Sequence, residues 1–98
     1  MSADSKWYLI SYDVREPKRL RRTMKLLKSF GERIQYSVFR VHCTGRQLER
    51  LHWELTRIME DEDFLLIVGL CPSCHARIIQ KGGITSWIEE EEPSYVIA

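Results

Sequence analysis

Short runs of apolar residues alternate along the chain with stretches in which apolar positions recur at helical spacing. Residues Trp7 to Asp13 are aromatic and β-branched, and they predict a buried strand that ends on a carboxylate. A helix is predicted next, starting near Pro17, with Asp13 or a nearby residue as its cap, and stopping at Gly31. Its apolar stripe consists of Leu20, Met24, Leu27 and Phe30.

The middle of the chain predicts a strand, a helix and a second buried strand. Residues 33–43 predict one strand, because apolar and polar side chains alternate there. A helix follows Thr44 and ends at the acidic run 60–63, with an apolar stripe of Leu48, Leu51, Leu55 and Ile58. The apolar run 64–70 predicts the second buried strand. Alternating β and α elements in so short a chain predict an α+β sandwich, one sheet covered by two helices.

The last part of the chain has weaker signals. A short helical turn is expected over 75–80, and the pair Gly82-Gly83 predicts a flexible joint. Trp87 and the triplet 95–97 look like late strand material on either side of an acidic stretch, 89–92, which is interpreted as a solvated or hinge segment.

Length and composition exclude several classes of protein. The chain has 98 residues, 44% apolar and 30% charged, which indicates one small globular domain and excludes wholesale disorder. No apolar run approaches the roughly 18 residues of a membrane span. The polar N-terminus lacks the apolar stretch of a signal peptide, so a cytoplasmic protein is expected. Three cysteines argue against a disulfide framework.

Charge is distributed unevenly, although the formal net charge is only +1. Residues 1–33 carry nine Lys or Arg and four Asp or Glu, whereas residues 60–98 carry two Lys or Arg and eight Asp or Glu. The basic residues of the first predicted helix are Lys18, Arg19, Arg21, Arg22, Lys25 and Lys28. Such a face attracts a phosphate backbone through counterion release. The alternative is a solvated helix surface, although a purely structural face more often mixes the two signs.

Two further groups could carry chemistry. Asp13 lies at the carboxyl end of a strand, where a carboxylate either holds a hard cation such as Mg²⁺ or caps the next helix. Cys71 and Cys74 have the spacing of a zinc ligand pair, for which His42 with Cys43, or a partner chain, would complete four ligands. The alternatives for these thiols are small buried side chains beside a strand end, or catalytic thiol chemistry.

Several of these motifs together resemble one known family. Tyr12 and Asp13 close the first predicted strand, and an Arg-rich helix follows. The block Gly-Glu-Arg-Ile-Gln-Tyr-Ser-Val-Phe occupies residues 31–39, and the later apolar strand ends on Leu70. This combination resembles the Cas2 family of small CRISPR-associated proteins over about residues 6–80.

The resemblance implies a ferredoxin-like βαββαβ sandwich with an extra C-terminal strand, and an obligate homodimer. Residues 33–43 would then form two strands with a sharp bend, which the residue pattern alone does not indicate. The whole chain, 1–98, would be a single domain with its core over about 6–80, and residues 84–98 would dock as a strand on the partner subunit.

The resemblance also implies a metal-dependent endonuclease that acts on single-stranded RNA or double-stranded DNA. Asp13 would hold Mg²⁺ or Mn²⁺ near the two-fold axis of the dimer. Family positions that affect activity fall on Tyr12, Asp13, Arg22, Arg33 and Phe39. A further family arginine corresponds to Arg19 or Arg21. The two arginines Arg22 and Arg33 would neutralise charge on the phosphate.

Members of the family also join the CRISPR integrase subunit, Cas1, in the acquisition of new spacers. Two alternatives to a nuclease of CRISPR adaptation therefore stay open. The dimer could be a non-catalytic scaffold that holds nucleic acid for Cas1, or the chain could be a toxin-like ribonuclease of similar fold. Phosphate contacts carry no base information, so RNA and DNA remain alternative substrates.

Overall fold

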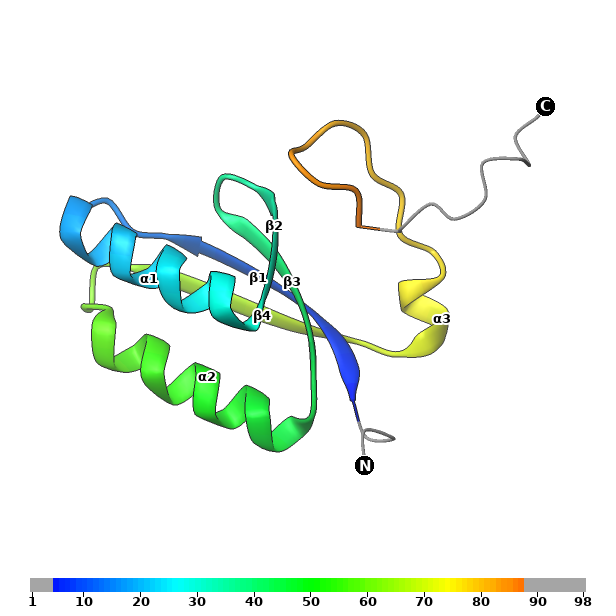
Figure 1. Ribbon diagram of the computed structural model, residues 1–98, viewed down its shortest axis with the longest axis horizontal. Helices are drawn as coiled ribbons and strands as arrows, with labels where there is room; N and C mark the ends of the chain where they lie inside the picture. Colours follow the sequence, from blue (N-terminus) through cyan, green and yellow to red (C-terminus); the bar gives the residue numbers. More distant parts are fainter. Residues whose placement is uncertain (1–4, 88–98) are drawn as a thin grey trace.

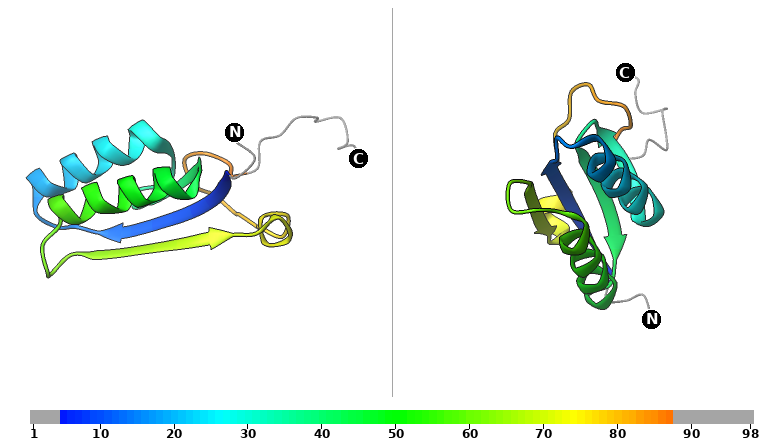
Figure 2. Two further views of the ribbon diagram at one scale, coloured as in Figure 1. Left: turned by 90° about the horizontal axis from the view of Figure 1, so that it is seen from below. Right: turned by 90° about the vertical axis from the view of Figure 1, so that its left-hand side faces the viewer.

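Strands and helices alternate along residues 5–87, the part of the chain that the computed structural model describes (Figure 1). The elements are β1 (Lys6–Asp13), α1 (Pro17–Phe30), β2 (Gly31–Gln35), β3 (Val38–Cys43), α2 (Gly45–Ile58), β4 (Phe64–Leu70) and α3 (Pro72–His75). The strands form one antiparallel sheet in the order β2-β3-β1-β4. Both long helices cover the same face of this sheet (Figure 2). The predicted α+β architecture, two helices on one sheet, is confirmed.

The core lies between the sheet and the two long helices. Alternate residues of the central strand β1 point into it, namely Tyr8, Ile10 and Tyr12. Leu27 of α1 and Leu51 of α2 meet them from the other side and are fully buried. β1 is paired on both sides as far as Ser11, and its last two residues, Tyr12 and Asp13, are held by β4.

Caps define where the helices begin and end. The Glu16 side chain caps α1 by accepting a hydrogen bond from the Arg19 N–H at 2.8 Å. The interpretation of Asp13 as the cap is therefore wrong, because the nearby Glu16 takes this role. Thr44 and Gln47 form a reciprocal capping box at the start of α2. Gly31 ends α1 as predicted, and a Cβ there would collide with the Arg40 carbonyl oxygen.

Two strand predictions need correction. Residues 33–43 are not one strand: β2 and β3 are antiparallel neighbours joined by a turn at Tyr36 and Ser37. The bend that the family resemblance implied is therefore confirmed. The strand over 64–70 has the predicted bounds, but it is not buried on both faces. Phe64, Leu66 and Val68 are 52%, 45% and 37% exposed, because β4 is an outermost strand and the helices cover only one face of the sheet.

The segment after β4 also differs from its prediction. The helical turn lies at Pro72–His75, earlier than expected, and Trp87 is buried against Trp7 without belonging to a strand. Backbone N–H groups of Ile84 and Thr85 donate to the Ile34 carbonyl oxygen of β2 at 2.6 and 3.4 Å. Residues 84–87 thus pack on their own chain. The rest of the predicted C-terminal strand, the triplet 95–97 and the acidic stretch 89–92 lie outside the described residues.

Within residues 5–87, no helix combines the length and the apolar character needed to cross a bilayer.

Candidate functional site

A hollow of about 720 Å³ lies at the carboxyl end of β1. Its walls come from the end of β1, the first turns of α1, the turn between β2 and β3, and the first residue of β4. Three residues singled out in the sequence line it together: Tyr12, Asp13 and Arg33. Phe64 lines it as well, opposite Asp13 in the strand register. Sequence reasoning missed Phe64, because only the pairing of β1 with β4 brings it there.

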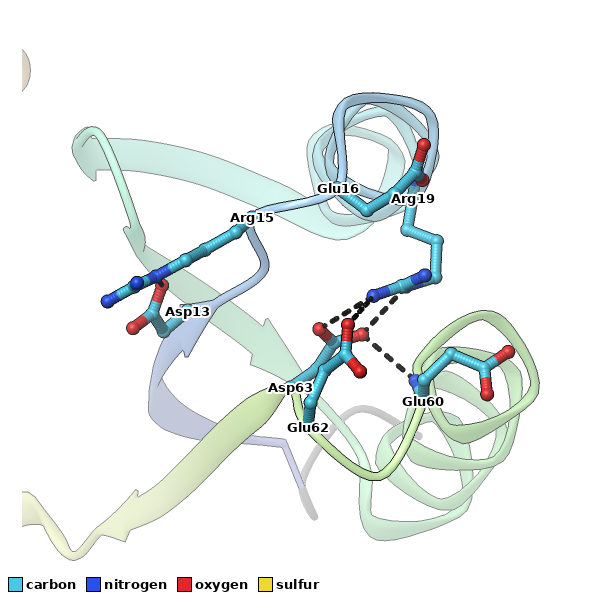
Figure 3. Close-up of polar contacts among 7 residues, drawn as sticks. All are labelled: Asp13, Arg15, Glu16, Arg19, Glu60, Glu62 and Asp63. Atoms are coloured by element: carbon cyan, nitrogen blue, oxygen red, sulfur yellow. Dashed lines mark hydrogen bonds and ion pairs between the residues drawn. The ribbon is translucent and has the colours of Figure 1, made fainter.

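Asp13 presents an exposed carboxylate to this hollow. Its Oδ1 lies 3.7 Å from the Arg15 Nε, and both side chains are largely exposed (Figure 3). An ion pair exposed to this degree contributes little stability, so the carboxylate stays available to a ligand despite Arg15. Carboxylate oxygens are ligands that Mg²⁺ and Mn²⁺ prefer. Asp13 could therefore hold a divalent cation, with the remaining positions filled by water, phosphate or a second protein chain.

Tyr12 lines the hollow and is hydrogen-bonded to the turn between β2 and β3. Its hydroxyl donates to the Tyr36 carbonyl oxygen at 3.0 Å, and its backbone N–H donates to the Ser37 carbonyl oxygen at 3.1 Å. Burial raises the pKa of Tyr12, and the nearby Arg33 guanidinium opposes this rise. The hydroxyl is therefore a neutral donor near pH 7. Tyr12 positions the turn next to Arg33 and is not suited to act as a nucleophile.

The other residues expected to affect activity are placed differently. Phe39, expected as a position that affects activity, is fully buried in the core, where its ring lies 6.1 Å from that of Tyr12 and out of reach of a substrate. It can act only by supporting Tyr12. Arg22 is exposed on α1 and lines a different hollow, with Trp53 and Arg57 of α2. The structure thus brings Asp13, Tyr12 and Arg33 together and leaves Arg22 outside this group.

Arg19 is engaged within its own chain. Its Nε lies 2.9 Å from the Asp63 Oδ2 and its Nη2 2.9 Å from the Glu62 Oε2 (Figure 3). The hydrogen bond from Arg19 holds the pKa of the Asp63 carboxyl below its ordinary value. These contacts occupy the Arg19 guanidinium and tie α1 to the loop before β4, which argues against the prediction that Arg19 binds nucleic acid. The acidic run 60–63 was expected only to end a helix.

The remaining basic residues of α1 are exposed on one arc of the helix surface. They are Lys18, Arg21, Arg22, Lys25 and Lys28. The helix turns its opposite side to the sheet, with Thr23 and Leu27 buried. This arc is a concentrated positive surface, because none of the residues of α1 is acidic.

A zinc site made by one chain, which was one of the alternatives for Cys71 and Cys74, does not form among the described residues. No three His, Cys, Asp or Glu side chains gather as a metal-binding group anywhere in residues 5–87. His42 stacks on the Trp7 ring at 4.7 Å, and Cys43 is buried. Cys71 and Cys74 are exposed, so the alternative of small buried thiols holds only for Cys43.

Comparisons with known proteins identify relatives of this chain. The family model described as CRISPR associated protein Cas2 matches residues 6–78. The CRISPR-associated endoribonuclease Cas2 1 of Chloroflexus aurantiacus is 38% identical over 74 residues, 74% of this chain and 80% of the relative. The CRISPR-associated endoribonuclease Cas2 of Thermus thermophilus is 39% identical over 66 residues, 67% of this chain and 70% of the relative.

Solved structures agree with these sequence relatives. The hypothetical protein TT1823 from Thermus thermophilus matches with a TM-score of 0.70 and 30% identity, covering 82% of this chain and 93% of its own. Streptococcus pyogenes Cas2 matches with a TM-score of 0.69 and 29% identity, and the match covers 78% of this chain and 99% of that structure's chain. A chain of a partial Cas6-RT-Cas1–Cas2 complex matches with a TM-score of 0.67 and 26% identity, covering 80% and 92%.

Proposed function

The chain belongs to the Cas2 family of CRISPR-associated proteins, and on this basis we propose that it is a metal-dependent endonuclease that takes part in spacer acquisition. The hollow at the end of β1 carries the proposal, since an exposed carboxylate, that of Asp13, and a guanidinium, that of Arg33, both line it. Several relatives are named endoribonucleases, which supports single-stranded RNA as a substrate. Double-stranded DNA is the second substrate of the proposal.

Asp13 is the residue that would hold Mg²⁺ or Mn²⁺. Its oxygens are exposed, and it stands at the rim of the hollow. When bound, the cation would polarise the phosphoryl group and activate water for attack. One carboxylate per chain is a small share of a cation's ligands, so we infer that a second copy of the chain supplies another Asp13.

The remaining residues of the hollow bind and orient the substrate. Arg33 would pair with the phosphate oxygens and neutralise the negative charge that builds on them. Tyr12 acts as a positioning residue, because its two hydrogen bonds hold the turn that follows Arg33. Among the described residues that line the hollow, none is His or Lys, so neither an imidazole nor an amine there takes a proton from the attacking water.

The proposed working unit is a homodimer of ferredoxin-like subunits. The βαββαβ element order and the strand order β2-β3-β1-β4 support the ferredoxin-like arrangement. An exposed apolar row on β4, formed by Phe64, Leu66 and Val68, supports association through the open face of the sheet. Since Asp13 lies opposite Phe64 in the register, such a dimer brings both Asp13 residues to its interface.

Nucleic acid would also bind along the exposed basic arc of α1. Five basic side chains lie on this arc, and their charge suits the phosphate backbone without reading bases. The likeness to a chain of a Cas1–Cas2 complex supports Cas1 as a partner. It also favours a second candidate function, in which the dimer is a scaffold that holds nucleic acid for Cas1 and cuts nothing.

A cleavage assay separates these two functions. The full-length protein is incubated with single-stranded RNA or duplex DNA in Mg²⁺, with and without a chelator. We expect cleavage that the chelator stops, and a loss of about 100-fold or more in Asp13→Asn, since a lost metal contact costs several kcal/mol. Asp61→Asn is the matched control, because it removes an exposed carboxylate outside the hollow.

The possible outcomes are distinct. An Asp13→Asn variant that cuts at the wild-type rate would show that Asp13 is not the metal ligand. A wild-type protein that binds both nucleic acids and cuts neither would establish the scaffold function instead.

A further inference from the structure

Cys71 and Cys74 are brought together by the way β4 passes into α3. β4 ends at Leu70, Pro72 opens α3, and Cys71 occupies the N-cap position between them. An N-cap side chain faces the backbone N–H of the third helical residue, which here is Cys74. The Cys74 N–H donates to the Cys71 Sγ at 3.4 Å, and the two sulfur atoms lie 3.3 Å apart.

The two thiols differ in acidity. The Ser73 hydroxyl, whose Oγ is 3.2 Å from the Cys71 Sγ, and the Cys74 N–H lower the pKa of Cys71 to about 7. The neighbouring Cys71 sulfur raises the pKa of Cys74. Near neutral pH, Cys71 is therefore the nucleophile of the pair, and Cys74 keeps its proton until a second step. This asymmetry is typical of redox-active Cys-x-x-Cys pairs.

The third cysteine has the opposite environment. Cys43 is buried in the sheet, and burial raises the pKa of its thiol. Cys43 is therefore expected to be unreactive, and its reactivity can be compared with that of the exposed pair in the same molecule. The exposed thiols are not part of a metal-binding group, since no third His, Cys, Asp or Glu joins them within the described part of the chain.

We propose that Cys71 and Cys74 form a redox-active dithiol that is reversibly oxidised to an intramolecular disulfide by low-molecular-weight disulfides of the glutathione type. Both thiols are exposed, and their separation lies within the roughly 3 to 3.5 Å of a near-attack geometry. The proposal is independent of the nuclease function, because neither cysteine lines the hollow at Asp13.

The reaction is a thiol–disulfide exchange in two steps. The Cys71 thiolate attacks one sulfur of the small disulfide, whose S–S bond breaks, so a mixed disulfide forms and one thiolate leaves. Cys74 gives up its proton and attacks the Cys71 Sγ, releasing the second small thiolate. Two protein thiols are oxidised to one disulfide, and one small disulfide is reduced to two thiols.

Alkylation and mass spectrometry of the full-length protein test the proposal. The protein is equilibrated in buffers of graded glutathione-to-glutathione-disulfide ratio, trapped with iodoacetamide after denaturation, and mapped by peptide mass. We expect two of the three thiols to disappear together as the buffer becomes oxidising, with the disulfide mapped to Cys71 and Cys74. Dithiothreitol should restore both. Cys43 should stay alkylatable throughout, and Cys43→Ala should behave like the wild type.

Single variants identify the attacking thiol. Cys74→Ser should stop at a stable mixed disulfide on Cys71, and Cys71→Ser should react several-fold more slowly at neutral pH. A wild-type protein that retains three alkylatable thiols in every buffer would overturn the proposal. A stable mixed disulfide in the wild type would overturn it too, as would a zinc ion found by native mass spectrometry to be held by both thiols.

Discussion

Three carboxylates near the carboxyl end of β1 show how the surroundings decide the role of a residue. Asp13 is exposed at the rim of the hollow, with Arg15 alongside it. Glu16 caps α1 through the Arg19 N–H. Asp63 is almost completely covered and accepts hydrogen bonds from the Arg19 side chain and from the Glu60 N–H. Asp13 is thus available to a ligand, whereas Glu16 and Asp63 hold the fold.

Replacing Asp63 should make stability depend less on pH. Arg19 lowers the pKa of Asp63 in the folded state, so its stabilising contribution is fully present above the ordinary Asp value of about 3.9 and is lost as pH falls through the lowered value. Asp63→Asn should therefore unfold at lower urea concentration than the wild type at pH 7, measured by Trp fluorescence. The difference between the two proteins should shrink below about pH 4.

Asp61→Asn is the matched control for this experiment, because it removes an exposed carboxylate from the same loop. We expect it to unfold close to the wild type at both pH values. A gap between Asp63→Asn and the wild type that is as large in acid as at pH 7 would contradict the ion pair as the cause.

Removing the Tyr12 hydroxyl should slow cleavage while leaving the fold intact. Tyr12→Phe loses the hydrogen bond to the Tyr36 carbonyl oxygen, which should cost about 0.5–1.5 kcal/mol of stability. Because that bond holds the turn next to Arg33, we expect cleavage to fall by up to about tenfold. Rates on RNA, measured beside urea unfolding, check both effects. Tyr8→Phe removes a hydroxyl from the same strand outside the hollow, and a loss of rate as large in that variant would contradict the positioning role.

At the scale of elements, α1 carries two different sets of charged side chains. Arg19 points to the loop before β4 and stabilises the packing of helix and sheet. Five other basic residues form the exposed arc. One side of the helix therefore stabilises the fold and another presents positive charge to solvent. Only the exposed arc should bind phosphate.

Removing charge from the exposed arc should reduce the salt dependence of nucleic-acid binding. Each phosphate neutralised on duplex DNA contributes about −0.9 to the slope of log affinity against log salt. Arg21→Ala/Lys25→Ala should flatten that slope by about 1.8 per chain and weaken unrelated sequences equally. Arg77→Ala/Lys81→Ala removes two exposed charges outside α1, and equal slopes for both double variants would exclude the arc as the phosphate surface.

At the scale of the whole molecule, the two faces of the sheet differ in what covers them. Both long helices lie on one face (Figure 2). On the other face, Trp87 covers Trp7, while the apolar row on β4 stays exposed. A single chain therefore leaves an apolar strip beside the hollow, which a second copy would cover under the proposed function.

Placing a charge in this strip should break the dimer. Leu66 is 45% exposed at the middle of the row, and burial of a leucine side chain contributes about 1.5–3 kcal/mol. Leu66→Glu should therefore raise the dimer dissociation constant by at least about tenfold, measured by sedimentation velocity. Ile79→Glu places the same charge at a 95% exposed aliphatic residue outside the sheet, and an equal weakening by this control would point away from β4.

Local patterns in the sequence determined most of the elements. The bounds of α1 and β4 agree with prediction, because a proline, a glycine and a change of apolar period mark them. The family was also readable, since the block over residues 31–39 lies in the matched range 6–78. Asp13 stood out for the same local reason, because a strand ends on it. Such signals depend only on residues close together along the chain.

Contacts between distant segments were decided only by the tertiary structure. Arg19 meets Asp63 across 44 positions, so no local pattern could tell this arginine from its exposed neighbours. The apolar run of β4 predicted a strand, but its place at the edge of the sheet left one face exposed. The hydrogen bond from the Tyr12 hydroxyl to the turn after β2 likewise joins residues 24 positions apart. Register and packing bring these groups together, because the energy that selects them comes from burial and pairing between segments.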